Sequence, residues 1–290
     1  MPALNISIVI PARDAACTLA DQLSAVVRQA TEFGAEVVVV DNGSKDRTAD
    51  VARGFVGVRT VVEPTAGVNR ARNAGTMAAL GDYIVLCDAD DVVHDGWLSA
   101  IVETACQGDY WGGPLDVSML NTERTLTRCG YLGGSAGGVV VDNLASEPFP
   151  APTGANCGYR KEVWEALGGF DNDLSGAGDE REFFWRAGSA GYRFVWISNA
   201  VVGYRLRGHW RDLVRREYRS GRSEARTYIR AASLGQRRSA PIEVFRVYAS
   251  IAANGMRGIR SVPDRWLAVR TLSRRAGRIV GSIQNRTFYP

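Results

Sequence analysis

Short apolar runs rich in valine and isoleucine alternate with stretches of helical periodicity over the first third of the chain. This alternation constrains the fold more than any other feature. We expect strands at 4–10, 36–40, 58–62 and 82–87 and helices at 17–33, 46–53 and 67–80. Strands this apolar, separated by helices of this length, predict an α/β fold with a mostly parallel sheet flanked by helices.

Three of the expected strands end in polar or turn residues. They run into Pro11-Ala12-Arg13-Asp14, Asp41-Asn42-Gly43-Ser44 and Asp88-Ala89-Asp90-Asp91. In sheets of this kind, ligands bind beyond the carboxyl ends of the strands. The sequence therefore predicts that the three segments lie along one edge of the sheet and that this edge holds the site.

The third segment places three carboxylates directly after an apolar strand. Such carboxylates repel one another unless a cation lies among them. Oxygen ligands favour Mg²⁺ or Mn²⁺, held by one or two carboxylates together with substrate phosphates. A polar turn that caps the next helix is the alternative interpretation. The segment at Asp41 offers a carboxylate, an amide and backbone N–H groups before a helix, which suits a nucleotide or phosphate but is also typical of a plain turn.

These segments, in this order, resemble the family 2 glycosyltransferases, which have the GT-A fold. The likeness covers about residues 4–205 and is carried by 7–12, 40–44 with Asp46 and Thr48, 71–75, 81–91, 168–171 and 178–182. It implies an inverting, metal-dependent glycosyltransferase (a hexosyltransferase-type enzyme). The donor would be a nucleoside-diphosphate sugar, with a UDP-sugar favoured. The acceptor would be a hydroxyl of a glycan, a lipid-linked saccharide or a natural-product aglycone.

The resemblance also implies roles for residues on the donor side. Pro11, Ala12 and Asp41 would hold the nucleobase, with Arg13, Asn42 and Ala89 beside them in the donor site. Arg72 would lie near the diphosphate or stabilise the base-binding loop. Asp88 would touch the ribose, and Asp90 would bind the Mn²⁺ or Mg²⁺, with Asp88 as a further ligand.

Two features depart from the family's pattern. Many members carry a metal-binding histidine shortly after the last strand of the domain, where this chain reads Val202-Gly203-Tyr204-Arg205. His209 is the nearest histidine and is either a replacement ligand or a surface residue. Members usually show Glu-Asp at the start of a late helix, with the Asp as base, and this chain shows Asp179-Glu180. The register puts Glu180 at the base position, and Asp179 is the alternative.

Two further residues are assigned to the acceptor side. Asn156 matches a position in the acceptor-side wall of the family's site, although an ordinary turn residue is the alternative. Glu182 belongs to the same acidic cluster as the candidate bases and is assigned to this side.

Charge divides the chain into two parts. Residues 1–204 hold 15 Lys+Arg against 26 Asp+Glu, whereas residues 205–290 hold 20 Arg, no Lys and 5 Asp+Glu. We expect a catalytic domain at 1–205, with a nucleotide-binding half to about 110 and an acceptor half from about 111, and a basic helical extension at 206–290, broken near Gly235, Pro241 and Pro263. A basic stripe is predicted for one helix of the extension, at Arg211, Arg215, Arg216, Arg219, Arg222 and Arg226.

The basic extension suggests an anionic partner. An anionic membrane surface, a soluble anionic acceptor and a second subunit all fit, as does a merely solvated face. Nucleic acid is the partner least supported, because no recognised module is visible. No run approaches the ~18 apolar residues of a membrane span. The five cysteines form no C-x-x-C, and no export signal is visible. We expect a cytoplasmic protein with peripheral contact at the inner face of the membrane.

Two other functions compete with this interpretation. A nucleotidyltransferase would carry a glycine-rich loop after the first strand, and 11–16 has no glycine. A non-catalytic sugar-nucleotide or glycan-binding protein on the same fold remains the alternative, because the base pair is inverted and the histidine is missing.

Overall fold

The computed structural model describes residues 4–129, 140–141, 144–145, 149–174, 178–233 and 262–287. The chain forms two units. Unit 1 comprises Met1–Leu120, Val140–Asp173 and Glu180–Arg205, and unit 2 comprises Asn121–Val139, Leu174–Asp179 and Leu206–Pro290. The helix breaks expected near Gly235 and Pro241 lie outside the described residues.

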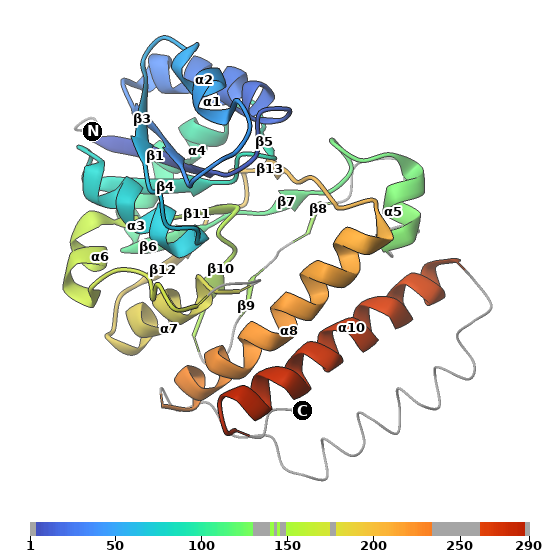
Figure 1. The fold of residues 1–290 in the computed structure, drawn as a ribbon. Coiled ribbons are helices and arrows are strands. Elements are labelled where there is room, and N and C mark those ends of the chain that lie inside the picture. The colour runs from blue at the N-terminus through green and yellow to red at the C-terminus, as the bar shows by residue number, and fades with distance from the viewer. Residues whose placement is uncertain are drawn as a thin grey trace. The chain divides into compact units, whose positions relative to one another are not determined.

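A seven-stranded sheet forms the centre of unit 1, in the order β12-β6-β11-β4-β1-β2-β3 (Figure 1). Its strands are β1 (Ile6–Ala12), β2 (Glu36–Asp41), β3 (Val58–Val62), β4 (Tyr83–Cys87), β6 (Tyr110–Gly112), β11 (Asn156–Arg160) and β12 (Phe194–Trp196). β1 pairs in parallel with β2 and β4, β2 with β3, and β6 with β12, while β11 is antiparallel to both of its neighbours. The predicted mostly parallel sheet is confirmed.

The first strand extends further than the sequence predicts. Pro11 closes the apolar run, so the prediction ended at residue 10. Pairing with β2 continues to Ala12, which lies opposite Asp41, and β1 therefore includes Pro11. The strand thus delivers its last residues directly to the carboxyl edge.

Helices cover both faces of this sheet. They are α1 (Leu19–Phe33), α2 (Thr48–Arg53), α3 (Val68–Ala78), α4 (Trp97–Thr104), α6 (Lys161–Leu167) and α7 (Arg181–Ser189). Because side chains alternate along a strand, the face with Ile8 and Ile10 belongs to a core shared with α1 and α4. The opposite face meets α3 so closely that a Cβ on Gly75 would lie 2.3 Å from Val9 Cγ1 and 2.8 Å from Val40 Cγ2.

Two small sheets complete unit 1. One has the order β5-β13-β7-β8, with β5 (Val92–Val93), β13 (Val202–Gly203), β7 (Leu115–Asp116) and β8 (Val140–Val141); the other pairs β9 (Leu144–Ala145) with β10 (Ala151–Pro152). β13 pairs antiparallel with β5. This pairing brings the residues after β13 beside the segment that follows β4. Strands of two residues have no periodicity, so the sequence did not predict them.

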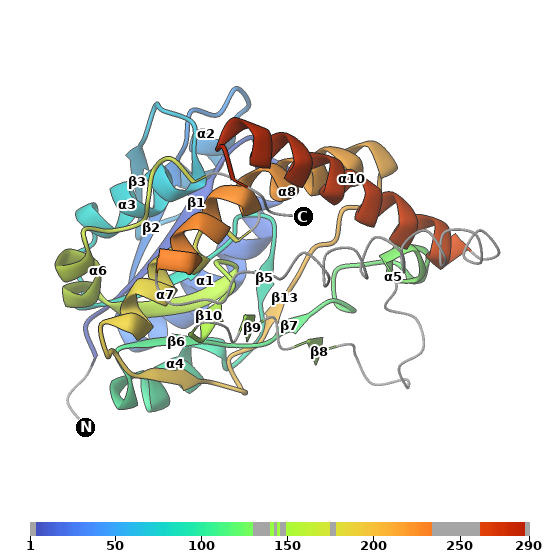
Figure 2. The ribbon, with the colours of Figure 1, turned by 90° about the horizontal axis from the view of Figure 1, so that it is seen from below.

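Unit 2 contains α5 (Glu123–Cys129), α8 (Trp210–Ser233) and α10 (Val262–Gln284). α8 and α10 lie side by side and run in the same direction (Figures 1 and 2). They approach closely at glycines, because a Cβ on Gly221 would lie 1.9 Å from the Arg274 carbonyl oxygen. The break expected near Pro263 falls at the start of α10: this proline lies in the first turn, where a helix needs no N–H from it, and residues 234–261 lie outside the described part of the chain. No helix of the described residues is long and apolar enough to span a membrane.

Candidate active site

The carboxyl ends of β4, β1 and β2 lie next to one another. These three strands are adjacent and parallel in the sheet, so Asp88, Ala12 and Asp41 come to the same edge. The Asn42 backbone N–H donates to the Ala12 carbonyl, with N and O 2.8 Å apart, and so continues the pairing beyond β2. The predicted gathering of the three polar segments is therefore present.

The loops after β1 and β2 are bound to each other. The Asp14 backbone N–H donates to Ser44 Oγ (3.1 Å), and the Lys45 N–H donates to Asp14 Oδ1 (2.7 Å). Asp14 adopts a left-handed backbone conformation with φ of 50°. Asp41 is half-buried beside them, and its Oδ1 accepts the Ser44 N–H (3.1 Å). The exposed Arg13 follows β1 directly, so these residues form one continuous rim.

The Asn42 side-chain amide hydrogen-bonds to the backbone of the loop that precedes α3. It is buried, and its Nδ2 donates to the carbonyls of Glu63 (3.0 Å) and Thr65 (2.8 Å) while its Oδ1 accepts the Gly67 N–H (2.8 Å). The side chain therefore holds the loop that precedes α3. Its predicted contact with the donor is untested and stays a prediction.

Three carboxylates gather after β4. One oxygen from each of Asp88, Asp90 and Asp91 lies within 4.8 Å of the others, and no other such cluster occurs in the described part of the chain. Asp91 is buried; its Oδ1 accepts the Arg205 N–H (2.8 Å), and its Oδ2 has no hydrogen-bond partner among the described residues. The set fits a hard divalent cation, because all donors are carboxylates and one buried oxygen is open. Asp91 is therefore a third candidate ligand beside the predicted Asp88 and Asp90.

Burial raises the pKa of Asp91 well above its usual range, and the charges of Asp88 and Asp90 raise it further. The Arg205 N–H and the Arg205 charge act in the opposite direction. Without a cation, the cluster is therefore electrostatically unfavourable in its fully charged form.

A buried glutamine on α1 holds this acidic segment. Gln22 Nε2 donates to the Asp88 carbonyl (3.0 Å), and its Oε1 accepts the Val93 N–H (3.0 Å). One heptad later, Gln29 binds the His94 carbonyl and the Leu98 N–H in the same way. Neither glutamine was predicted from the sequence as part of the site. The available signal was a polar residue at position 22 on the apolar face of α1, next to Leu23.

Arg72 on α3 lies against the candidate base. Its Nη1 is 3.7 Å from Glu180 Oε2, and both side chains are buried. Glu180 Oε1 also accepts the Gly154 N–H (3.2 Å), and Arg72 Nη1 donates to Asn69 Oδ1 (3.0 Å). A Cβ on Gly154 would lie 2.0 Å from Arg72 Nη2, so only glycine leaves room for this pair.

Helix α3 also contacts the Gly-Gly-Phe-Asp segment at residues 168–171. Asn73 Nδ2 donates to the Phe170 carbonyl (2.8 Å), and Asn73 Oδ1 accepts the Phe170 N–H (2.9 Å). Glu182 is buried and forms a two-point ion pair with Arg186, which also donates to the Leu167 and Gly169 carbonyls. Glu182 therefore stabilises this turn, and its predicted acceptor contact stays a prediction.

Asn156 is likewise engaged inside the protein. Its Nδ2 donates to the carbonyls of Pro114 (2.9 Å) and Ala200 (2.7 Å), and its Oδ1 accepts the Trp97 indole N–H (3.0 Å). These bonds fix the segments around β7 and β13. Its role in an acceptor wall remains a prediction.

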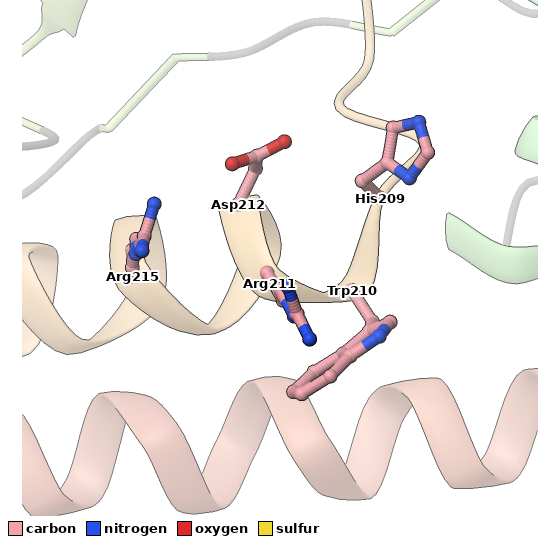
Figure 3. A pocket seen from close by; sticks show the side chains of 5 residues that line it. All are labelled: His209, Trp210, Arg211, Asp212 and Arg215. Carbon is pink, nitrogen blue, oxygen red and sulfur yellow. The ribbon is translucent and has the colours of Figure 1, made fainter.

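Two of the predicted residues belong to unit 2. Asp179 is buried. His209 is exposed and lies just before α8, at a surface hollow lined also by Trp210, Arg211, Asp212 and Arg215 (Figure 3). The Arg211 guanidinium lies 5.4 Å from the centre of the Trp210 ring. Metal binding by His209 and base catalysis by Asp179 stay predictions.

Comparison with known proteins agrees with this arrangement. The model of the family Glycosyl transferase family 2 matches residues 7–168. The glycosyltransferase AglE of Haloferax volcanii is 28% identical over 234 residues, covering 77% of this chain and 74% of AglE. The succinoglycan biosynthesis protein ExoA of Rhizobium meliloti is 25% identical over 273 residues, covering 90% of this chain and 79% of ExoA.

Solved structures show the same fold. The mannosyltransferase PcManGT from Pyrobaculum calidifontis, in complex with GDP-Man and Mn²⁺, matches with a TM-score of 0.60 at 20% identity, over 98% of this chain and 87% of that one. Glucosyl-3-phosphoglycerate synthase from Mycobacterium tuberculosis, with Mn²⁺, UDP and glucosyl-3-phosphoglycerate, matches with a TM-score of 0.57 at 17% identity, over 79% and 80% of the two chains. The predicted GT-A fold is thereby confirmed. This chain belongs to glycosyl transferase family 2 and is a glycosyltransferase.

Proposed function

We propose that this glycosyltransferase is metal-dependent and inverting, and that it transfers a sugar from a nucleoside-diphosphate sugar to a hydroxyl acceptor. The observation that carries the proposal is the group of Asp88, Asp90 and Asp91 at the carboxyl end of β4, with an open, buried oxygen on Asp91. Their position beside the rim formed by Ala12 and Asp41 suits a ligand that joins a base, a ribose and a diphosphate.

Mn²⁺ or Mg²⁺ would be held by Asp90 and Asp91, with Asp88 beside them, and His209 is proposed as a further ligand. A bound divalent cation would stabilise the negative charge that develops on a departing diphosphate. The three carboxylates would hold that ion at the carboxyl end of β4. Gln22 holds the backbone that carries these carboxylates, because it hydrogen-bonds to Asp88 and to Val93 at the two ends of this segment.

Glu180 is proposed as the general base, with Asp179 as the alternative. The acceptor O–H attacks the anomeric carbon; the new C–O bond forms as the bond to the phosphate oxygen breaks, and the proton passes to the carboxylate. A single displacement inverts the anomeric centre and needs one base and no protein nucleophile. Arg72 Nη1 lies 3.7 Å from Glu180 Oε2 and would help to orient this carboxylate toward the acceptor.

The donor is proposed to be a UDP-sugar. Pro11, Ala12 and Asp41 would hold the uracil, with Arg13, Asn42 and Ala89 around it. The two structural relatives carry GDP-Man in one case and UDP in the other. Guanine therefore has to be tested beside uracil. The acceptor would be a glycan, a lipid-linked saccharide or a natural-product aglycone, with Asn156 and Glu182 in its wall.

A thermal-shift panel tests the donor site directly. UDP, GDP, dTDP and CDP are each added with and without Mn²⁺, and a ligand at ~100 times its dissociation constant adds about 2.7 kcal/mol of stability. We expect UDP to raise the melting temperature only when Mn²⁺ is present. Stabilisation by none of the four would favour a non-catalytic relative that binds a different ligand.

The base is tested by turnover. Glu180→Gln and Asp179→Asn are compared for donor affinity and for sugar transfer to a hydroxyl acceptor. An enzyme that uses Glu180 loses turnover in the first variant while it keeps its affinity for the donor. A sugar-nucleotide-binding protein, the alternative function, shows no turnover in the wild type either.

An anionic membrane surface, at the inner face of the cytoplasmic membrane, is the proposed partner of unit 2. Five arginines on α8 are exposed, at positions 211, 215, 219, 222 and 226, whereas Arg216 is half-buried. Arg222 and Arg226 hydrogen-bond to the neutral side chains of Gln284 and Asn285. Between α8 and α10 the arginines are neutralised instead: Arg274 and Arg278 pair with Glu217 and Glu224. Positive charge is thus concentrated on the exposed face of α8.

Vesicle flotation tests this surface. Each basic residue near an anionic leaflet contributes about 1 kcal/mol. The triple variant Arg211→Gln, Arg215→Gln, Arg219→Gln is therefore expected to lose binding to phosphatidylglycerol vesicles. Its control removes the same charge from unit 1, by Arg28→Gln, Arg47→Gln and Arg53→Gln, all exposed residues. Equal binding by both triple variants, or binding to neutral phosphatidylcholine, would contradict the proposal.

A further inference from the structure

Arg205 is fixed beside the acidic group by two hydrogen bonds. It follows β13, which pairs with β5 and so lies next to the segment after β4. Its backbone N–H donates to Asp91 Oδ1 (2.8 Å), and its side-chain Nε donates to the Asp90 carbonyl oxygen (2.8 Å). The guanidinium is therefore held at one orientation next to three carboxylates. Many members of the family have a metal-binding histidine near this register, where this chain has Arg205.

The guanidinium forms no ion pair with these carboxylates. Within the described residues, Arg205 Nη1 and Nη2 have no hydrogen bond and no carboxylate partner. Other arginines of unit 1 that lie beside carboxylates do pair with them, as Arg186 does with Glu182. The positive side chain and the negative cluster are thus adjacent and yet held apart. A ligand that combines a metal cation with an anionic group is complementary to both.

We propose that Arg205 binds the diphosphate of the sugar donor through Nη1 and Nη2 and stabilises it as the leaving group. This inference rests on the proposed function, because it assumes a nucleoside-diphosphate donor. A guanidinium is always charged, and its planar fork matches two oxygens of a phosphate. Negative charge grows on the diphosphate as its bond to the anomeric carbon breaks, so a fixed cation there lowers the barrier.

The experiment follows affinity along the series uridine, UMP and UDP, measured by titration calorimetry with saturating Mn²⁺. The guanine series is run in parallel. Wild type is compared with Arg205→Gln, with Arg205→Lys and with the control Arg28→Gln, which removes an exposed arginine of α1. Arg205→Gln is expected to bind UDP about tenfold more weakly or worse while uridine binding is unchanged. The UDP affinity of Arg205→Lys is expected to lie between those of wild type and Arg205→Gln. The UDP affinity of Arg28→Gln is expected to match wild type.

A purely structural role would give a different result. Mn²⁺ binding without nucleotide, followed by electron paramagnetic resonance, reports whether the acidic segment keeps its shape in Arg205→Gln. We expect Mn²⁺ affinity to change less than UDP affinity. UDP affinity equal to wild type, or a loss of UDP affinity no larger than the loss of Mn²⁺ affinity, would overturn the proposal. A wild-type protein that binds no nucleotide of either series would instead overturn the proposed function itself.

Discussion

Arg72 Nη1 and Glu180 Oε2 lie 3.7 Å apart in the interior of unit 1, so the candidate base is half of a buried ion pair. The sequence suggested that Arg72 lies near the diphosphate or supports the base-binding loop. The structure places it between Asn69 and Glu180. Arg72 therefore contacts the candidate base, and α3 links the first part of the unit to the segment that holds Glu180.

Breaking this pair is expected to be costly. Arg72→Met or Glu180→Gln removes one member of a buried ion pair, and each single variant should lose about 3–5 kcal/mol of unfolding free energy. The double variant should lose less than the sum of the two. Urea unfolding measures all three. As a control, Asp95→Asn removes one partner of the exposed Arg28 pair and should cost about 1 kcal/mol or less. Strict additivity of the two buried changes would show that they are not coupled.

Gln22→Leu is expected to loosen the backbone of the acidic segment after β4. The change leaves the Asp88 carbonyl and the Val93 N–H without their side-chain partner, which should cost about 1–3 kcal/mol. Mn²⁺ affinity should fall as the segment loosens. Gln29→Leu is the matched control, since it makes the same kind of contact to His94 and Leu98. A comparable stability loss with unchanged Mn²⁺ affinity is expected there, and equal Mn²⁺ losses in the two variants would contradict the assignment.

Asp91→Asn is expected to have opposite effects on two quantities: the free energy of unfolding of the metal-free protein and the affinity for Mn²⁺. The variant removes one of three neighbouring negative charges while its amide oxygen can still accept the Arg205 N–H. We expect the free energy of unfolding in EDTA to rise and Mn²⁺ affinity to fall by about tenfold or more. Urea unfolding in EDTA and in Mn²⁺ measures both effects. A lower stability in EDTA would mean that repulsion is not what governs this cluster.

Glu36, which lies away from the candidate site, is expected to make the stability of the protein depend on pH. Burial by itself would raise the pKa of Glu36, but the Leu80 N–H, the Ser7 hydroxyl and Arg59 outweigh it, and the pKa is lowered. A lowered pKa means that the folded state favours the charged form. This stabilisation is therefore present above the unfolded-state pKa and is lost as the pH falls through the folded-state value.

Glu36→Gln is consequently expected to cost about 1–2 kcal/mol at pH 7. The difference from wild type should shrink as the pH falls below about 4. Urea unfolding across this range measures it. Asp50→Asn, which loses only an exposed contact to Arg53, should show a small difference at every pH. A Glu36→Gln cost that is constant from pH 7 to pH 3 would contradict the assignment.

The central sheet, and the edge at which its polar segments gather, could be predicted from the sequence. The runs at β1, β2 and β4 are apolar on both faces, which only a covered parallel sheet satisfies, and their polar ends then share one edge. Ordered local motifs were enough to identify the family. The predicted strand at 58–62 matches β3 residue for residue, because a run of β-branched residues is a local signal.

Tertiary structure alone decided which side chains meet. The pairing of Arg72 with Glu180, the clamp at Gln22 and the place of Arg205 each join segments that are 66 to 115 residues apart in the chain. The two-residue strands β5 and β13 bring Arg205 to the cluster, and such strands leave no periodicity to detect. Burial and hydrogen bonding are set by packing, so the sequence could propose Asn156 and Glu182 for the acceptor side but could not show that their polar atoms already bind within the protein.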